Sequence, residues 1–356
     1  MMRKAPPRFL FLDINQRCNL RCKHCYYWRR DNSDRDLYLS TLQRHAIIQE
    51  FAEMNPNGTV VICGGESMLD VDDYFSVTGE CIRLGIGCFS VINGTKVQTP
   101  SMADRMIMEG PSEITLSINS YKPEVHDATR GVTGSFKWVV KAMRLLLASR
   151  NRLNVKKPIY AMAVICEVNY RDLDRFYDFI LNDIGAEKLK LNFLQPSFGM
   201  PKWRVVDRFF KKNVISDAEA LASIIRECDR KYCLNINPAW LEHVKMYHRS
   251  IQENRNAAMG WLHLKGTREH ICNSYDRNIM VDLYGNASLC FNSAFPSFPL
   301  KVQGDLTTFW YERSLPIREK MTTCNRYCGI SHSVRRENAT WKPREDRPDN
   351  AGSMPC

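Results

Sequence analysis

The stretch Cys18-Asn-Leu-Arg-Cys22-Lys-His-Cys25 places three thiols within eight residues. It follows an apolar run, residues 9–14, that predicts a first β-strand. Thiolates are the protein ligands of iron–sulfur clusters, and a four-iron cluster needs a ligand for each iron. Three cysteines therefore leave one iron open to a small molecule. The alternatives for such a triplet are a structural zinc loop or three unrelated buried thiols.

Composition limits the class of protein. The 356 residues are enough for one large domain or two smaller ones, and 44% are hydrophobic and 25% charged, as in ordinary globular proteins. No stretch approaches the roughly 20 apolar residues of a membrane span, and no N-terminal signal segment is visible. Fourteen cysteines without such a signal favour metal binding in a reducing cytoplasm over a disulfide framework. The net charge of +11 favours an anionic substrate or, equally, solubility and docking of a reductant.

Strand and helix patterns alternate through the first 200 residues. The strand-like runs are residues 9–14, 59–63, 88–92, 113–118, 158–165 and 188–194, and the helical segments between them are 40–53, 72–84, 100–109, 135–147 and 171–182. Ser40 and Ser135 are the expected helix caps. Several strand-like runs are apolar throughout, which is typical of a parallel sheet covered by crossover helices. A closed eight-fold barrel needs two more units, so we expect an α/β fold with an open, six-unit partial (βα)6 TIM-like barrel over residues 8–198.

The remainder of the chain has a different character. Residues 198–215 are irregular, basic and aromatic, and helical patterns follow at 217–230 and 238–254. A turn at 282–286 separates two short strand-like runs, which predicts a hairpin. We expect a helical link over residues 199–271, a small cysteine-marked domain over 272–337 and a flexible tail over 338–356.

Polar motifs follow the predicted strands. In parallel α/β folds, ligand-binding groups lie in loops at the carboxyl ends of strands, where the cysteine loop falls. Gly64-Gly65-Glu66 follows the second strand; glycine permits close backbone approach, and a carboxylate can pair with an ammonium group. Such a triplet taken alone is often only a turn.

The order of these motifs resembles that of the radical S-adenosylmethionine (radical SAM) enzymes, which carry a Cys-x3-Cys-x2-Cys loop after the first strand. The resemblance implies that Cys18, Cys22 and Cys25 bind a [4Fe-4S] cluster. It also implies that S-adenosylmethionine chelates the open iron, and that an electron from the cluster cleaves the cofactor to a 5′-deoxyadenosyl radical. A zinc loop then becomes a remote alternative.

The same resemblance implies contacts to S-adenosylmethionine. Gly64, Gly65 and Glu66 correspond to the motif that holds the methionine ammonium group, although Ser67 replaces the usual proline. Further contacts are implied for the ribose, the methionine carboxylate and adenine: Ser117; Arg130 of Asp127-x-x-Arg130-Gly131; and His24 with Leu194. Guanidinium suits a carboxylate because it forms bidentate pairs. The alternative for Arg130 is a solvated arginine at a helix start. Asn119-Ser120 stands where Asp-Gly is common in the family.

A second group of thiols lies near the carboxyl terminus. Its members are Cys272, Cys290, Cys324 and Cys328. Their spacing resembles the auxiliary-cluster extensions called SPASM, with seven cysteines, and twitch, with four. The resemblance implies one complete auxiliary [4Fe-4S] cluster, and a structural zinc site is the alternative.

Two other cysteines lie where predicted strands reach the ligand-binding end. Cys63 ends the second run and Cys166 follows the fifth. A thiol there could donate a hydrogen atom to a substrate radical, as in radical epimerases. Packing as a small hydrophobic residue is the favoured explanation for each.

The resemblance implies a radical SAM oxidoreductase that abstracts hydrogen from an unactivated C–H bond. Because the cysteine loop begins at residue 18, we expect no N-terminal domain that grips a leader peptide. Oxidation of a small molecule such as a sugar or cyclitol is therefore expected first. The alternatives are a maturase whose basic segment 203–212 receives an acidic peptide, a redox-neutral epimerase, and a non-catalytic Fe–S electron carrier or sensor. We expect a flavodoxin- or ferredoxin-like reductant, and neither a membrane nor a nucleic acid as partner.

Overall fold

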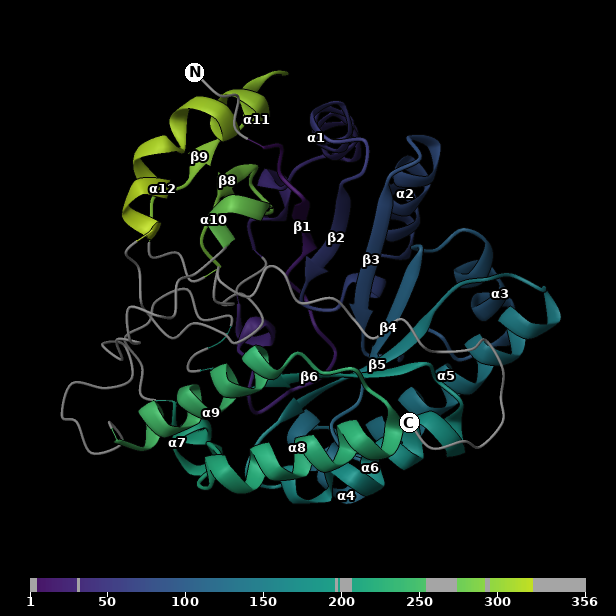
Figure 1. Ribbon diagram of the computed structural model, residues 1–356. Coiled ribbons are helices and arrows are strands. Elements are labelled where there is room, and N and C mark those ends of the chain that lie inside the picture. The colour runs from purple at the N-terminus through teal and green to yellow at the C-terminus, as the bar shows by residue number, and fades with distance from the viewer. Residues whose placement is uncertain are drawn as a thin grey trace.

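One nine-stranded sheet organises the molecule (Figure 1). The computed structural model describes residues 5–30, 33–195, 198, 207–253, 274–291 and 295–322. The strands lie in the order β6-β5-β4-β3-β2-β1-β7-β8-β9. Their bounds are β1 Phe9–Asn15, β2 Thr59–Gly64, β3 Gly87–Ile92, β4 Glu113–Ser117, β5 Ile159–Ile165, β6 Lys188–Phe193, β7 Asn278–Val281, β8 Asn286–Ser288 and β9 Phe298–Pro299.

The first six strands form the expected open barrel. Each of β1 to β5 pairs in parallel with the next strand along the chain, up to β6, with crossover helices between them. The helices are α1 Thr41–Met54, α2 Val71–Arg83, α3 Pro100–Met108, α4 Pro123–Arg130, α5 Ser135–Arg152, α6 Leu173–Asp178, α7 Arg208–Asn213, α8 Ala218–Tyr232, α9 Pro238–Glu253, α10 Ser274–Arg277, α11 Asp305–Thr308 and α12 Leu315–Thr322. The predicted partial (βα)6 barrel is confirmed.

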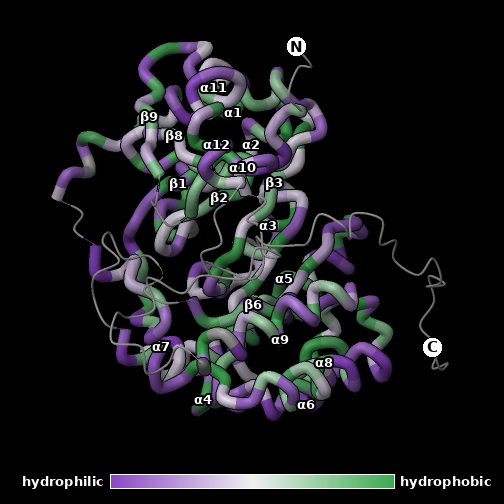
Figure 2. Tube along the Cα trace, turned by 60° about the vertical axis from the view of Figure 1, so that its left-hand side comes forward, coloured by the Kyte–Doolittle hydropathy of each residue, from purple (hydrophilic) through white to green (hydrophobic). Residues whose placement is uncertain are grey.

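Strand alternation separates the two faces of the sheet. In β1, Leu10, Leu12 and Ile14 are at most 1% exposed and belong to the hydrophobic core, whereas the alternate residues are half-buried. Because successive side chains of a strand point to opposite faces, Phe9, Phe11 and Asp13 lie on the other face, toward the barrel interior. Helices α6 and α8 alternate between hydrophobic and hydrophilic segments along the tube, as helices with one buried face do (Figure 2).

Helix boundaries agree with the sequence within about two residues at α1, α2, α3, α8 and α9, and differ at α5 and α6. Ser40 caps α1 and forms a full capping box with Gln43, as its position predicted. Ser135 was expected to cap α5 but is the first helical residue; the cap is Gly134, with φ 87°. The Ser135 hydroxyl instead donates to the Asp127 carboxylate at 2.8 Å. The predicted helix 171–182 is divided into a 3-10 turn, the short α6 and a π-helical turn.

The C-terminal hairpin joins the barrel sheet. Strand β7 pairs in parallel with the free side of β1, and β8 pairs antiparallel with β7, as the turn at 282–286 predicted. Leu39 donates its backbone N–H to the carbonyl of Leu283 at 2.7 Å, which fixes the hairpin turn beside the segment leading into α1. Among the described residues, no helix is long and apolar enough to cross a bilayer.

Candidate active site

The cysteine loop leaves β1 at the carboxyl end of the sheet and is fixed to the end of α4. Arg21 donates its backbone N–H to the carbonyl of Arg130 at 3.1 Å. Gly131 caps α4 with φ 70°, and a Cβ atom there would lie 2.1 Å from the carbonyl oxygen of Arg21. Only glycine accepts both the left-handed backbone and this close approach. The Asp-x-x-Arg-Gly element and the cysteine loop are thus one packed unit.

The Gly64-Gly65-Glu66 loop lies against the other side of the cysteine loop. Gly65 donates its N–H to the carbonyl of Asn15 at 3.1 Å, and Glu66 donates to that of Arg17 at 2.7 Å. A Cβ atom on Gly65 would lie 2.2 Å from the Arg17 oxygen. The two glycines therefore let the backbone after β2 run directly beside the residues that lead into Cys18.

The Glu66 side chain is 3% exposed and already has two hydrogen-bond donors. Its two carboxylate oxygens accept the backbone N–H groups of Met68, at 3.1 Å, and Asn93, at 2.7 Å. Burial raises the pKa of Glu66 to about 7, against the effect of these hydrogen bonds. Each oxygen retains one further acceptor position, so the role of Glu66 toward an ammonium group stays a prediction.

Arg130 is a buried cation at the centre of this arrangement. It is the last residue of α4 and is 7% exposed, unlike a solvated arginine at a helix start. Its Nη1 lies 3.7 Å from Sγ of Cys22, and its Nη2 lies 3.4 Å from Oδ1 of Asn119. Its buried Nε has no partner, and among the described residues no carboxylate forms an ion pair with it. The site therefore offers an unsatisfied guanidinium beside a predicted cluster ligand.

The other predicted cofactor contacts lie near the same end of the sheet. Ser117 ends β4 and is half-buried. His24 is 9% exposed, and its burial and then the charge of Arg130 lower its pKa to about 3. Leu194 follows β6, is buried, and its carbonyl accepts the hydroxyl of Tyr247 at 2.6 Å. Their contacts to the cofactor remain predictions.

The three thiols occupy a low-dielectric environment. Cys22 is buried, and Cys18 and Cys25 are half-buried. Burial raises the pKa of Cys18 and of Cys25 to about 12. Among the described residues, no three His, Cys, Asp or Glu side chains lie close enough to hold one metal ion. That finding concerns a single-ion site; a four-iron cluster spreads its thiolates more widely, because each binds a different iron.

The two candidate hydrogen donors occupy different environments. Cys63 is half-buried and pairs in register with the inward-facing Asp13. Cys166 is 1% exposed and belongs to the hydrophobic core, and burial raises its pKa to about 12. The interior position of Cys63 is the more compatible with contact to a substrate, and both roles stay predictions.

Sequence reasoning missed an inward-facing polar group on β1. Asp13 is a half-buried carboxylate for which the described residues provide no hydrogen bond, and burial raises its pKa to about 7. Its charge is the largest cause of the raised pKa of Tyr27, whose ring lies 3.9 Å from the guanidinium carbon of Arg30. The alternation of Phe9, Phe11 and Asp13 against the buried positions was the signal that could have revealed it.

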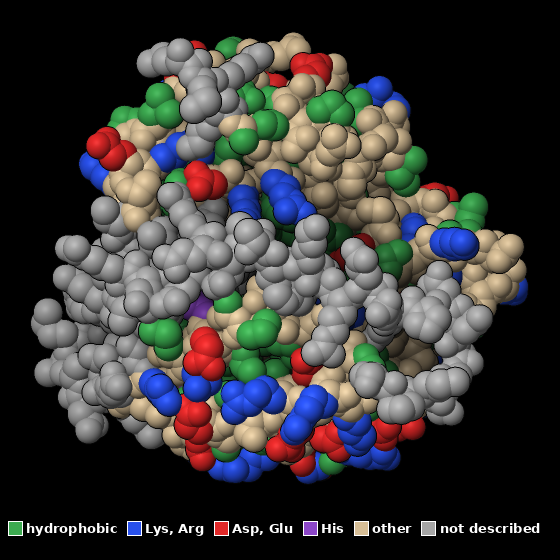
Figure 3. Space-filling model, in the orientation of Figure 1, with side chains coloured by type: hydrophobic (Ala, Val, Ile, Leu, Met, Phe, Trp, Pro, Cys, Tyr) green, Lys and Arg blue, Asp and Glu red, His purple; other side chains and the backbone are tan. Residues whose placement is uncertain are grey.

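The described part of the basic segment 203–212 reaches the cysteine loop and the residue that follows it. Asp207 caps α7, and its Oδ1 accepts the hydroxyl of Tyr26 at 2.9 Å. The rings of Phe209 and His24 lie 6.5 Å apart. The exposed cations of α7 therefore lie close to the cysteine loop. In the space-filling view, hydrophobic and charged side chains line a hollow near the middle of the face shown (Figure 3).

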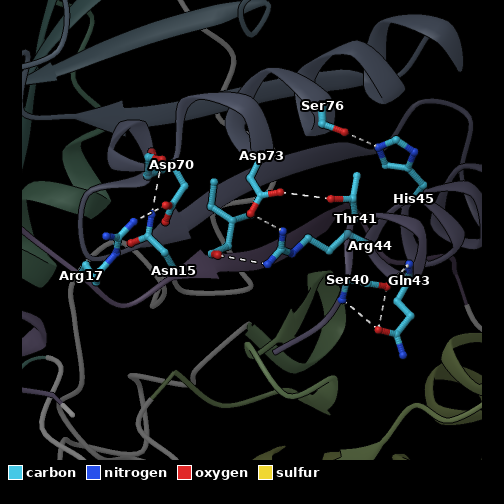
Figure 4. Close-up of polar contacts among 12 residues, drawn as sticks. Asn15, Arg17, Ser40, Thr41, Gln43, Arg44, His45, Asp70, Asp73 and Ser76 are labelled. Carbon is cyan, nitrogen blue, oxygen red and sulfur yellow. Dashed lines mark hydrogen bonds and ion pairs between the residues drawn. The ribbon is translucent and has the colours of Figure 1, made fainter. Parts of the chain in front are cut away.

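An arginine–aspartate network lies on the helix side of β1 (Figure 4). Arg17 pairs with Asp70. Arg44 pairs with Asp73 at 2.9 Å and donates to the carbonyl of Ile14 at 3.2 Å. These residues line a polar pocket of about 250 Å³ between the N-terminal ends of α1 and α2. The network braces the strand end that leads into Cys18.

Of the predicted auxiliary ligands, the structure describes only one. Cys290 is half-buried and follows β8 by two residues. Cys272, Cys324 and Cys328 lie outside the described residues, as do the predicted tail 338–356 and residues 203–206 of the basic segment. The auxiliary cluster and the boundary of a separate domain at 272 remain predictions.

The open parallel barrel, with three thiols after its first strand and glycines after its second, defines the radical SAM class of fold. Residues 12–180 match the model of the Radical SAM superfamily, so this part of the chain is a radical SAM domain. Such a domain implies a four-iron cluster and S-adenosylmethionine as cofactors.

Several characterised proteins are similar to this chain. An AdoMet-dependent heme synthase of Oleidesulfovibrio alaskensis is 32% identical over 39% of this chain and 35% of its own length. Mycofactocin maturase MftC of Mycobacterium tuberculosis is 31% identical over 54% of this chain and 46% of its own length. The matches thus span about a third to a half of these relatives.

Solved structures show the same fold at low sequence identity. Streptococcus suis SuiB bound to the precursor peptide SuiA aligns with a TM-score of 0.62 and 14% identity, over 90% of this chain and 68% of that chain. The anSMEcpe structure with bound AdoMet and a Cp18Cys peptide aligns with a TM-score of 0.57 and 16% identity, over 89% and 83%.

Proposed function

We propose that this protein is a radical SAM enzyme whose cofactor site is the unit formed by the cysteine loop, the Gly-Gly-Glu loop and the end of α4. The observation that carries the proposal is Arg130, a buried guanidinium with a free Nε and no carboxylate partner among the described residues. Burying an unpaired cation is costly, so the site favours an anionic group that arrives with a ligand. The methionine carboxylate of S-adenosylmethionine is such a group.

Each residue of this unit has a distinct task. Cys18, Cys22 and Cys25 would ligate three irons, and Arg130 would orient the cofactor by its carboxylate. A bound cluster supplies the electron that cleaves S-adenosylmethionine, so that a substrate hydrogen atom can be abstracted. Glu66 holds the loops after β2 and β3 together through Met68 and Asn93. The backbone beside the cofactor is therefore fixed before it binds.

The test is anaerobic cleavage of S-adenosylmethionine by the reconstituted protein with dithionite as electron donor. Wild type should form 5′-deoxyadenosine, and with both proposed clusters it should hold about eight irons. The Cys18→Ala/Cys22→Ala/Cys25→Ala variant should hold about half that iron and form no 5′-deoxyadenosine. A Cys81→Ala variant is the control, because Cys81 is a buried core thiol away from this loop. Formation of 5′-deoxyadenosine by the triple variant would overturn the assignment.

The substrate proposed first here is a peptide. Support comes from the maturase relative, from the precursor peptide in the similar SuiB structure, and from the basic helix α7 beside the cysteine loop. Its exposed cations Arg208, Lys211 and Lys212 complement an acidic peptide. Oxidation of a sugar or cyclitol stays the second candidate, and no relative described above carries such a name.

The rate of 5′-deoxyadenosine formation in the presence of added substrates distinguishes the peptide proposal from the small-molecule proposal. Acidic peptides should increase the rate of 5′-deoxyadenosine formation, and a Lys211→Glu/Lys212→Glu variant should lose that increase but keep the basal rate. A mixture of sugars and cyclitols is the parallel trial. Stimulation by that mixture alone, unaffected by the α7 variant, would reject the peptide proposal and support the small-molecule one.

The auxiliary cluster is a further part of the proposal. Cys272, Cys290, Cys324 and Cys328 would complete one cluster without an open iron. A Cys324→Ala/Cys328→Ala variant should then keep dithionite-driven cleavage of S-adenosylmethionine while its iron content falls by about four. Zinc in place of iron at these thiols would identify a structural zinc site instead of an auxiliary cluster.

A further inference from the structure

A cationic and aromatic patch covers the outside of the cysteine loop. It consists of Arg21, Lys23, Trp28 and Arg29. The three cations are exposed and Trp28 is half-buried. The guanidinium carbons of Arg21 and Arg29 lie 5.3 Å and 4.6 Å from the Trp28 ring, so cation–π contacts hold the charges in place.

The patch is hydrogen-bonded directly to two predicted cluster ligands. Nη1 of Arg21 donates to the carbonyl of Cys18 at 2.8 Å, and Nε1 of Trp28 donates to the carbonyl of Cys22 at 3.2 Å. The exposed side chains are therefore one hydrogen bond from the backbone of the residues that would hold the cluster. This surface is unlike the arginine–aspartate network, where each guanidinium is matched by a carboxylate.

We propose that the patch of Arg21, Lys23, Trp28 and Arg29 is the docking surface for an acidic, low-potential, one-electron donor protein. This inference rests on the proposed function, because it assigns how the cluster is reduced. One electron passes from the reduced donor to the oxidised cluster, so the donor is oxidised by one equivalent and no proton or bond is exchanged. Electron transfer weakens steeply with distance, which favours a surface lying on the ligand loop itself.

Charge complementarity identifies the chemistry of the partner. Three exposed cations within one short segment, two of them held against Trp28, attract an acidic face, increase the rate of productive encounter and orient that face over the loop. The donor-driven rate should therefore fall as ionic strength rises, because salt screens exposed charges. Dithionite, a small diffusible reductant, should not need the patch.

The experiment compares two electron donors in charge-reversal variants of equal charge. Lys23→Glu/Arg29→Glu alters the patch, and Lys137→Glu/Lys141→Glu on the exposed face of α5 is the matched control. With reduced flavodoxin at low salt, the patch variant should form 5′-deoxyadenosine about tenfold more slowly than wild type. The control should stay within twofold of wild type. With dithionite, all three proteins should have equal rates.

Other outcomes would overturn the inference in distinguishable ways. Equal loss in both variants would show an effect of net charge alone. Loss with dithionite as well would mean that the patch shapes the loop or receives the substrate, and the neutral Lys23→Gln/Arg29→Gln variant would then show the same loss. An unchanged flavodoxin rate would place docking elsewhere. If wild type itself fails with dithionite, the proposed function fails and docking is not the cause.

Discussion

Two regions at the carboxyl end of the sheet contain buried arginines, and they differ in how those charges are satisfied. In the arginine–aspartate network, Arg44 is 4% exposed and has both the Asp73 carboxylate and the Ile14 carbonyl as partners. In the unit of the cysteine loop and the end of α4, Arg130 is 7% exposed, and the described side chains that accept from it are Cys22 and Asn119, at 3.7 and 3.4 Å. Burial alone therefore does not distinguish a structural cation from a binding one. Within the described residues the two arginines differ in their counter-charge, and the proposed role of Arg130 in binding rests on that difference, because a buried cation without a carboxylate favours an anionic ligand.

The largest effect on stability is expected from removing Arg44, the buried arginine whose charge is paired. Arg44→Ala removes the cation that pairs with Asp73 and the side chain that donates to the Ile14 carbonyl, and leaves Asp73 with the Thr41 hydroxyl as a donor. This loss should lower the free energy of unfolding by about 3 kcal/mol. Urea denaturation of the apo protein measures this loss. S-adenosylmethionine affinity of the folded variant should match wild type. A weakened affinity without loss of stability would reverse the comparison between the two regions.

Removing Arg130 should have the opposite pair of effects, leaving stability unchanged and weakening the binding of S-adenosylmethionine. Arg130→Met should leave apo stability near that of wild type, because a buried charge without a carboxylate is replaced by an apolar chain of similar length. S-adenosylmethionine binding should weaken by about 1.5–3 kcal/mol, or about 10- to 150-fold in Kd. Equilibrium binding to the reconstituted protein tests this, with unchanged iron content as the control. Unaltered affinity would remove Arg130 from the cofactor site.

Two glycines that follow Arg130 differ in how closely they approach the cysteine loop. Gly131 and Gly134 both have left-handed φ values, but a Cβ atom would meet the Arg21 carbonyl only at Gly131. Gly134→Ala should cost about 1 kcal/mol of stability from backbone strain alone. Gly131→Ala should cost at least twice as much and should also weaken S-adenosylmethionine binding, because the cysteine loop must move. Equal costs would show that the close contact is unimportant.

The smallest effect concerns the unpaired carboxylate Asp13 and depends on pH. Burial raises its pKa from 3.8 to about 7, so the folded protein holds this proton more tightly than the unfolded chain does. Stability from this group is present below pH 3.8 and is lost as the pH rises toward 7. Asp13→Asn removes that loss, so the free energy of unfolding of the variant should increase relative to that of wild type between pH 4 and pH 7. We expect a gain of about 1 kcal/mol, because the half-buried side chain remains partly hydrated. Stability curves at several pH values test it, and a variant that falls behind wild type as pH rises would contradict the sign.

The features that could be predicted from the sequence are those set by neighbouring residues and by regular hydrophobic patterns. The six strands, the Ser40 cap and the hairpin turn at 282–286 each depend on neighbouring residues, and the structure confirms them. Two misses, Ser135 and the helix 171–182, lie where a tertiary partner or a change in helical geometry overrides propensity. The missing counter-charge of Arg130 was not predictable, because it depends on which carboxylates the fold brings near. The inward direction of Asp13 could have been predicted, since it follows from strand alternation.

The pairing of β7 with β1 has a consequence for how the chain is made. Residues 9–12 and 278–281 form adjacent parallel strands, although they are far apart in the sequence. During synthesis, β1 emerges early but keeps one open edge until the hairpin follows, and open edges invite pairing with other chains. Closing so distant a contact is slow, so the partial barrel should first collapse around β1 to β6 and be sealed last by β7. The strand that leads directly into Cys18 is then the strand whose edge is protected only after residues 278–281 have been synthesised.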